Sequence, residues 1–219
     1  MDRRLLWFFA LLAPVVVWSW IAPHDRLTWW LEAGPVVAAA VLIIRLRTRF
    51  PLSTVLLALA WVHGVVLLVG AHYTYAEVPA FNWLRDLTNG TRNNYDKLGH
   101  FVQGFVPAIL TREILLRTSP LRDRGDGRRS GWLGFLVVSV CLAFSAFYEL
   151  VEWAVAEMSD EAAESFLGTQ GYVWDTQSDM ALALLGAICA LVVLSRLHDR
   201  SLAKVLAGRG GIGQSERSP

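Results

Sequence analysis

The stretch that decides the fold is NNYDKLGHFVQGFVPAIL, residues 93–110. Asp96, Lys97 and His100 stand within five residues near its start, and a mostly apolar run follows them. Such a run is typical of a membrane-crossing helix, whereas ionisable side chains are unstable where they face lipid. The stretch therefore predicts a transmembrane helix whose polar end faces the interior of a helix bundle.

Apolar residues elsewhere in the chain also come in blocks. Of the 219 residues, 54% are hydrophobic and the mean hydropathy is +0.41, whereas soluble domains have about 45–50% apolar residues. A helix needs roughly 20 mostly apolar residues to cross a bilayer. Six blocks predict an all-α, polytopic transmembrane helix bundle, with spans near residues 5–21, 27–44, 52–71, 98–116, 132–153 and 179–194. The second block is the weakest, because Glu32, Gly34 and Pro35 fall in its first turns.

The loops between these blocks leave no room for a soluble domain. The longest, near 73–97 and 157–176, are too short to bury a core of their own. Residues 1–205 are therefore expected to form a single transmembrane bundle, and residues 206–219 a flexible cytoplasmic tail. The first block is expected to be retained rather than cleaved as a signal peptide, because Trp18 and Trp20 stand where small residues should precede cleavage.

Basic residues alternate between the loops, and this alternation predicts the orientation. Fifteen Lys and Arg residues lie before span 1, between spans 2 and 3, between spans 4 and 5, and after span 6, and the other three loops hold four. Short basic loops stay in the cytoplasm, so both termini are expected there. The basic loops are short and tied to spans, which favours contact with anionic membrane lipids over nucleic acid.

This orientation places ionisable residues of three helices at one depth, near the outer face of the membrane. Asp96 and His100 are four residues apart at the start of span 4, and Gln103 continues their face. Glu149 and Glu152 are three apart near the end of span 5. Asp175 and Asp179 are four apart at the start of span 6. Polar faces in membrane helices normally turn toward a bundle interior or a water-filled cavity.

Ordinary structural roles compete with a functional site here. Asp96 and Asp175 are placed to cap helices, Lys97 could extend to the headgroups, and a solvated outer rim could hold the whole set. Capping does not explain Glu149 and Glu152, because negative charge is disfavoured near a helix C-terminus.

The acids also need positive charge close to them. Five carboxylates cannot all ionise together at low dielectric, so protons, a cation, or an arginine from the loop (Arg85 or Arg92) must balance them. Carboxylates with one imidazole suit a divalent ion such as Mg²⁺, Mn²⁺ or Zn²⁺, although no tight motif such as HExxH is present. The candidate metal ligands are Asp96, His100, Glu149, Glu152, Asp175 and Asp179.

Three segments carry a resemblance to a known family. YDKLGHFVQGFVPAILTREILLR, FSAFYELVEW and FLGTQGYVWDTQSDMALALLGA resemble the YjdF family of bacterial inner-membrane proteins over about Arg92 to Arg200. The resemblance implies a multi-pass protein of the bacterial inner membrane and implies no reaction. A weaker similarity runs to VanZ-like membrane proteins, with Ala183 in place of their asparagine. It rests on Asp96, Lys97, His100, Phe101, Glu149, Asp179 and Gly186.

The first functional hypothesis is an enzyme that acts on a lipid or lipid-linked substrate. The candidate catalytic residues are His100, Glu149, Glu152 and Lys97. The candidate substrate-binding residues are Lys97, Gln103, Tyr148 and Trp153. The cofactor is unknown, and one divalent metal ion is the candidate.

Two alternatives are a small transporter or proton-coupled carrier, and a non-catalytic scaffold. Transport predicts polar residues at the membrane midplane, where His63 is the candidate, although a lone histidine with apolar neighbours is more often structural. Arg112 and Glu113 are explained by contact with the headgroups or by pairing with each other. A scaffold would use the small-residue face of span 6, which more often packs within one chain. That face holds Ala181, Ala183, Gly186, Ala187 and Ala190.

Overall fold

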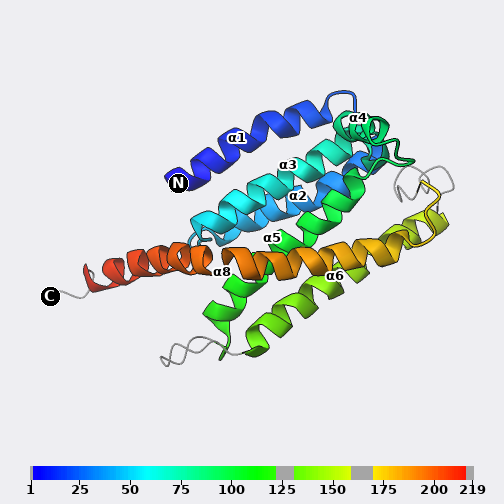
Figure 1. The fold of residues 1–219 in the computed structure, drawn as a ribbon. Helices are drawn as coiled ribbons and strands as arrows, with labels where there is room; N and C mark the ends of the chain where they lie inside the picture. The colour runs from blue at the N-terminus through cyan, green and yellow to red at the C-terminus, as the bar shows by residue number, and fades with distance from the viewer. Residues whose placement is uncertain (1, 122–130, 159–169, 216–219) are drawn as a thin grey trace.

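The computed structural model describes residues 2–121, 131–158 and 170–215, and side chains as far as Ala207. Its helices are α1 (Arg3–Trp20), α2 (Arg26–Leu46), α3 (Thr54–Tyr73), the short 3₁₀ helix η1 (Tyr75–Glu77), α4 (Pro79–Leu87), α5 (Tyr95–Thr118), α6 (Gly131–Met158) and α8 (Asp175–Ser215) (Figure 1). No strand occurs in these described ranges. The predicted all-α class is confirmed.

Five of the helices are long and apolar enough to cross a membrane: α1, α2, α3, α6, and α8 as far as Ala207. The predicted span 98–116 lies within α5, which is not among the five. The 24 residues of α5 give a length of about 36 Å, enough for a span. Its polar residues lower its mean hydropathy, but Asp96, Arg112 and Glu113 are all buried.

The first three long helices begin where a side chain can cap them. The carboxylates of Asp2 and Asp25 and the hydroxyl of Ser53 accept backbone N–H bonds from residues two or three positions later. These bonds satisfy donors that a helix start otherwise leaves unpaired. The starts of α1, α2 and α3 therefore follow directly from local sequence.

The helices form two groups that meet at α3 and α5 (Figure 1). One apolar core lies among α1, α2 and α3, around Leu12, Ala33 and Leu68. The other lies among α5, α6 and α8, around Ile109, Val137 and Ala187, and Leu56 of α3 joins it. Helix α5 is therefore enclosed by helices of both groups.

Helices α5 and α8 approach each other so closely that two glycines are required. A Cβ atom added to Gly104 would collide with the backbone carbonyl of Ala183, and one added to Gly186 would collide with that of Phe101. Small residues allow such close contact between membrane helices. The predicted small-residue face of α8 thus packs inside this chain, with Ala183, Ala187 and Ala190 fully buried and Ala181 exposed on another side.

Two features differ from the sequence prediction. Helix α8 continues to Ser215, far past the predicted end of the span at 194, so its last turns overlap the segment 206–219 that was expected to be a flexible tail. The loop 73–97 contains η1 and α4, of which α4 begins with Pro79, a residue favoured at the first position of a helix. Neither η1 nor α4 was predicted, because η1 is too short and α4 is too polar to appear as an apolar block.

Candidate functional site

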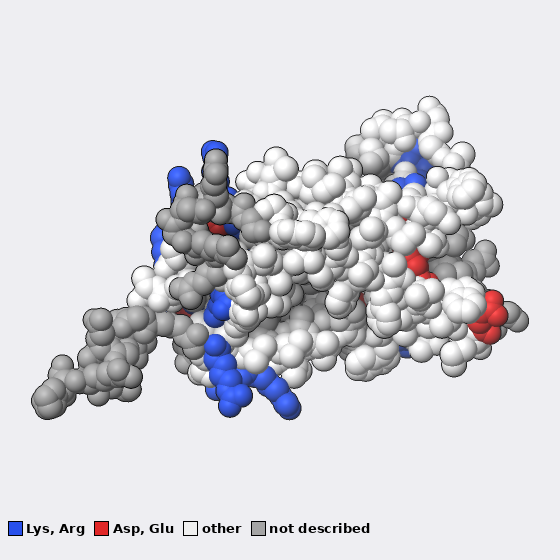
Figure 2. All heavy atoms as spheres, turned by 90° about the horizontal axis from the view of Figure 1, so that it is seen from below, with Lys and Arg blue, Asp and Glu red and all other residues white. Residues whose placement is uncertain are grey.

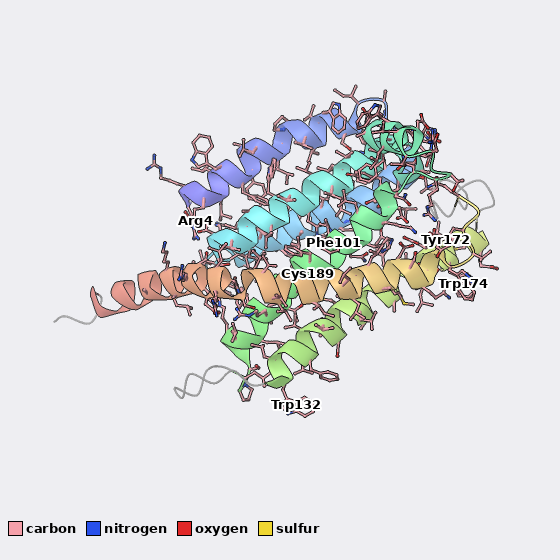
Figure 3. The ribbon with its side chains drawn as sticks, in the orientation of Figure 1. Arg4, Phe101, Trp132, Tyr172, Trp174 and Cys189 are labelled. Carbon is pink, nitrogen blue, oxygen red and sulfur yellow. The ribbon has the colours of Figure 1, made fainter. Side chains whose placement is uncertain are left out.

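A group of buried acids lies where α5 and α8 begin and α6 approaches its end, at the same end of the molecule as α4 (Figure 1). We call it the acidic cluster and define it by Glu32, Arg92, Asp96, His100, Glu149, Glu152, Asp175 and Asp179. Six of these residues are the predicted metal ligands, and all six are buried. The labelled Tyr172 and Trp174 mark the same end of the bundle, whereas Phe101 and Cys189 lie nearer its middle (Figure 3).

His100 stands at the centre of the cluster. Its Nε2 atom is 3.3 Å from Oδ1 of Asp96, one helical turn earlier on α5. Its Nδ1 atom is 3.7 Å from Oε1 of Glu149 on α6. Asp96, His100 and Asp179 each offer one ligand atom, and these atoms lie within 4.8 Å of one another. Because metal–ligand bonds are about 2.0–2.6 Å long, one ion between the three can reach all of them.

Several polar atoms of this cluster are buried without a hydrogen-bond partner in the described part of the chain. They are Nδ1 of His100, Oε1 of Glu149 and Oδ1 of Asp179. Oγ of Ser145, one turn from Glu149 on α6 but outside the cluster, is unpaired in the same way. An unsatisfied buried polar group costs about 1–3 kcal/mol, and more when it is charged. Three such atoms on three residues in contact or close to one another indicate a place for a positively charged ligand.

Positive charge reaches the cluster from one side. Arg92 donates to Asp175 over 2.5 Å and approaches Asp96 at 3.5 Å. Arg92 is thus the loop arginine that folds in, whereas Arg85 bonds to Asp86 and Asn82 on α4. Lys97 is half-buried, with its Nζ atom 4.7 Å from the ring centre of Tyr172. One guanidinium does not balance so many carboxylates.

Glu32 belongs to the acidic cluster and was missed by sequence reasoning, which took it only as a weakness of the second span. Its side chain is 4% exposed, and the hydroxyl of Tyr148 donates to its Oε2 atom over 3.5 Å. The hydroxyl of Tyr75 lies near the same carboxyl. Burial raises the pKa of the Tyr75 phenol well above its usual value, so this hydroxyl keeps its proton. An acid inside an apolar block was the available signal.

The predicted substrate-binding residues are spread around the cluster. Tyr148 contacts Glu32, Gln103 is half-buried on α5, and Lys97 lies at the rim. Trp153 is 61% exposed on α6, next to the buried Glu152. The structure therefore brings ligand atoms of Asp96, His100 and Asp179 within 4.8 Å of one another, with Glu149 beside His100. Asp175 pairs with Arg92 instead, and Glu152 is buried without a ligand atom in that group. The substrate-binding set stays a prediction.

A second buried polar group lies near the opposite end of α5. We call it the His198 network and define it by Ser53, Arg112, Glu113, Arg117, His198 and Asp199. Arg112 contacts Nδ1 of His198 at 2.6 Å and Asp199 at 2.6 Å. Arginine has no acceptor atom, so Nδ1 accepts the bond and Nε2 of His198 donates to Glu113 over 3.0 Å.

Glu113 accepts hydrogen bonds from two further donors in the same network. It accepts a bond from the backbone N–H of Ser53 at 3.1 Å and one from Arg117 at 2.8 Å. The prediction that Arg112 and Glu113 contact headgroups or each other is therefore wrong, because both are almost fully buried and pair across helices with α3 and α8. His198 was missed because the last span was predicted to end at 194.

Comparison with known proteins identifies the family. The model of a family described as "Predicted membrane protein (DUF2238)" matches residues 4–200. The chain is also similar to "Inner membrane protein YjdF" of Escherichia coli (strain K12), at 45% identity over 193 residues that cover 88% of this chain and 90% of that protein. No solved structure matches. The resemblance seen over Arg92 to Arg200 is confirmed and extends to the first three helices, so the chain is an integral membrane protein that belongs to this YjdF-like, DUF2238 family.

Proposed function

We propose that this protein is an enzyme of the bacterial inner membrane that holds a divalent cation in the acidic cluster and acts on a lipid or lipid-linked substrate at the outer face. The observation that carries the proposal is the set of ligand atoms from Asp96, His100 and Asp179, buried and within 4.8 Å of one another. The unpaired atoms of His100, Glu149 and Asp179 support it, because a cation would satisfy them.

The proposed topology has six spans, with both termini in the cytoplasm. The length of α5 and its enclosure by other helices support a sixth span. The charge distribution supports the orientation, because most Lys and Arg side chains visible in Figure 2 lie toward the end where α1 begins and α8 ends. Reporter fusions after Arg124 should give a cytoplasmic signal, and fusions after Ser165 an external one. The reverse pair of signals would place the acidic cluster at the cytoplasmic face.

The donor set suits a hard or borderline divalent ion. Carboxylate oxygens and one imidazole nitrogen are ligands for Mg²⁺, Mn²⁺ and Zn²⁺. Asp96, His100 and Asp179 would hold the ion, which would supply Lewis acidity to the site. Glu149, 3.7 Å from His100, is placed to orient the imidazole or to hold a proton. Lys97, at the rim beside Tyr172, is placed to attract a phosphate group.

The surroundings of the cluster support a substrate that lies at headgroup depth. Trp83, Trp153 and Trp174 are 66%, 61% and 62% exposed, and all three lie at the same end of the molecule as the cluster. Tryptophan is enriched where a membrane protein crosses the lipid–water interface. A lipid headgroup or a lipid-linked group would reach this depth without leaving the membrane.

The test is the metal content of the purified, full-length protein. We expect one ion per chain after incubation with Mn²⁺ or Zn²⁺, and loss of that ion in Asp179→Asn and Glu149→Gln. Asp86→Asn is the matched control, because Asp86 is an exposed acid on α4 at the same end of the molecule. A wild-type protein with no affinity for any of these ions would overturn the proposal, and stabilisation by Asp179→Asn would then favour carboxylates that share protons.

Transport has less support than a site on one side of the membrane. Between the acidic cluster and the His198 network, α5 and α8 are in backbone contact at Gly104 and Gly186, with Ala108, Ile109 and Ala187 fully buried beside them. These closely packed apolar residues separate the acidic cluster from the His198 network. His63 is half-buried on α3 and stands apart from both groups as they are defined here.

A further inference from the structure

Glu32 comes from a different part of the fold than the other acids of the cluster. Helix α2 packs mainly on α3 and belongs to the first apolar core, whereas Asp96, Glu149 and Asp179 belong to α5, α6 and α8. Glu32 nevertheless reaches the hydroxyl of Tyr148 on α6. In the described ranges its hydrogen-bond partner is this hydroxyl group, and no basic side chain bonds to it. A carboxylate in an apolar span without a basic partner normally marks a functional position.

The position of Glu32 is set by a closely fitted aromatic ring. The ring of Tyr75 lies between Gly70 of α3 and Gly99 of α5, and a Cβ atom at either glycine would overlap it. A ring confined in this way holds its hydroxyl in one place. The confined ring of Tyr75 therefore limits the space open to the Glu32 carboxyl, which accepts its hydrogen bond from Tyr148.

The charges around Glu32 are those of the proposed cation site. Its partner Tyr148 immediately precedes Glu149 on α6. The ring of Tyr75 packs on Gly99 of α5, the residue before His100. Arg92 lies within ion-pair distance of two of the other five acids, so a further acid increases the repulsion that a cation would relieve. The ion is thus expected to interact favourably with Glu32 as well as with its nearest ligands.

We propose that Glu32 is the contribution of α2 to the cation site, so that a bound ion joins the α1–α3 group to the α5–α6–α8 group. This inference rests on the proposed cation site and extends it to a fourth helix. Glu32 acts through its negative charge, either as a ligand or as a carboxylate next to the ligands. The two tyrosines beside it hold it in position and keep it from turning toward lipid.

The test compares Mn²⁺ binding by the full-length protein and its Glu32→Gln variant. Glutamine has the shape of a neutral glutamic acid and keeps an acceptor oxygen for Tyr148, so the variant should fold as the wild type does. We expect its affinity for Mn²⁺ to fall by about 10- to 100-fold, the usual effect of removing a group that supports a metal site. The melting temperature without ion should stay the same or rise.

Two further variants keep the result unambiguous. Glu32→Asp retains the charge on a shorter side chain and should bind Mn²⁺ more tightly than Glu32→Gln, whereas Asp86→Asn should bind like the wild type. Wild-type affinity in Glu32→Gln would overturn this inference alone and would show Glu32 to be a neutral hydrogen-bonding group. Absence of Mn²⁺ and Zn²⁺ binding in the wild type would overturn the proposed cation site, and this inference with it.

Discussion

The acidic cluster and the His198 network are both buried polar groups that join α5 to α8, yet they differ in how their atoms are paired. In the His198 network, Glu113 has three donors and Arg112 has two partners. In the acidic cluster, His100, Glu149 and Asp179 each have an atom without a hydrogen-bond partner in the described residues. The two groups have a histidine and acids in common and differ in their balance of charge.

The difference supports a structural role for the His198 network and the functional role proposed for the acidic cluster. Two arginines face two acids in the His198 network, and its histidine has a partner at each ring nitrogen. The acidic cluster has six acids, of which Asp96 and Asp175 lie within ion-pair distance of Arg92. Buried charges that are paired and hydrogen-bonded can be tolerated in a folded protein, whereas unpaired ones are costly unless a ligand completes them. Burial alone therefore does not identify a site, and incomplete pairing does.

The largest expected effect comes from breaking the His198 network. Glu113→Ala would leave Arg117, His198 and the N–H of Ser53 without their acceptor, and removing one partner of a buried charge pair costs about 3–5 kcal/mol. Chemical or thermal unfolding in detergent should show this loss. Glu157→Ala, at an exposed position near the end of α6, serves as the control. A loss below about 1 kcal/mol would mean that the network is not structural.

A smaller loss is expected from separating α5 and α8. Gly104→Ala would push a methyl group into the carbonyl of Ala183, and such overpacking typically costs about 1–3 kcal/mol. Since Asp96 and His100 on α5 face Asp179 on α8, Mn²⁺ affinity should fall as well. Gly134→Ala is the matched control, because its added Cβ would meet no atom within 4 Å. That variant should gain about 0.5–1 kcal/mol from helix propensity. Equal stability of the two variants would contradict the close crossing.

Removal of an acid from the acidic cluster should change stability in the opposite direction to Glu113→Ala. Without an ion, Asp179→Asn relieves repulsion between buried carboxylates and should raise the unfolding free energy by something on the order of 1 kcal/mol. With Mn²⁺ present, the wild type should gain stability and the variant should not. Melting curves of both proteins with and without the ion measure this crossover. A destabilised variant without ion would place the acidic cluster in the same structural class as the His198 network.

The smallest effect is expected at His63, which belongs to neither group. It is half-buried on α3, and no charged residue lies three or four positions away in the sequence. His63→Gln should change the unfolding free energy by less than about 0.5 kcal/mol and leave Mn²⁺ affinity unchanged. If His63→Gln were expressed normally but lost function, that result would support the transport hypothesis.

The sequence could predict the helices and which residues share a helix face, but not which other helices those faces contact. Spacing of three and four residues correctly groups Asp96 with His100 and places Glu149 with Glu152 on one stripe, since helix geometry is local. The pairing of Arg112 with His198 could not be predicted, because it depends on which helices are neighbours. In addition, the second half of α8, which carries His198, has the composition of a polar loop. Glu32 was misjudged for a related reason, because the tyrosines beside it lie on α6 and η1.

Close contacts at Gly104 and Gly186 hold α5 and α8 together where they cross, and Gly104 marks the crossing point on α5. Along α5, His100 and Asp96 lie roughly 6 and 12 Å from that point, and Glu113 lies roughly 14 Å away on the other side. A change of three degrees in the angle between the two helices would therefore move the acidic end by about 0.3–0.6 Å. Ligand distances of Mg²⁺ and Ca²⁺ differ by about the same amount, some 0.3–0.5 Å. If the proposed ion binds in the acidic cluster, the bonds of Glu113 and His198 at the other end of these helices would help to set which ionic radius fits.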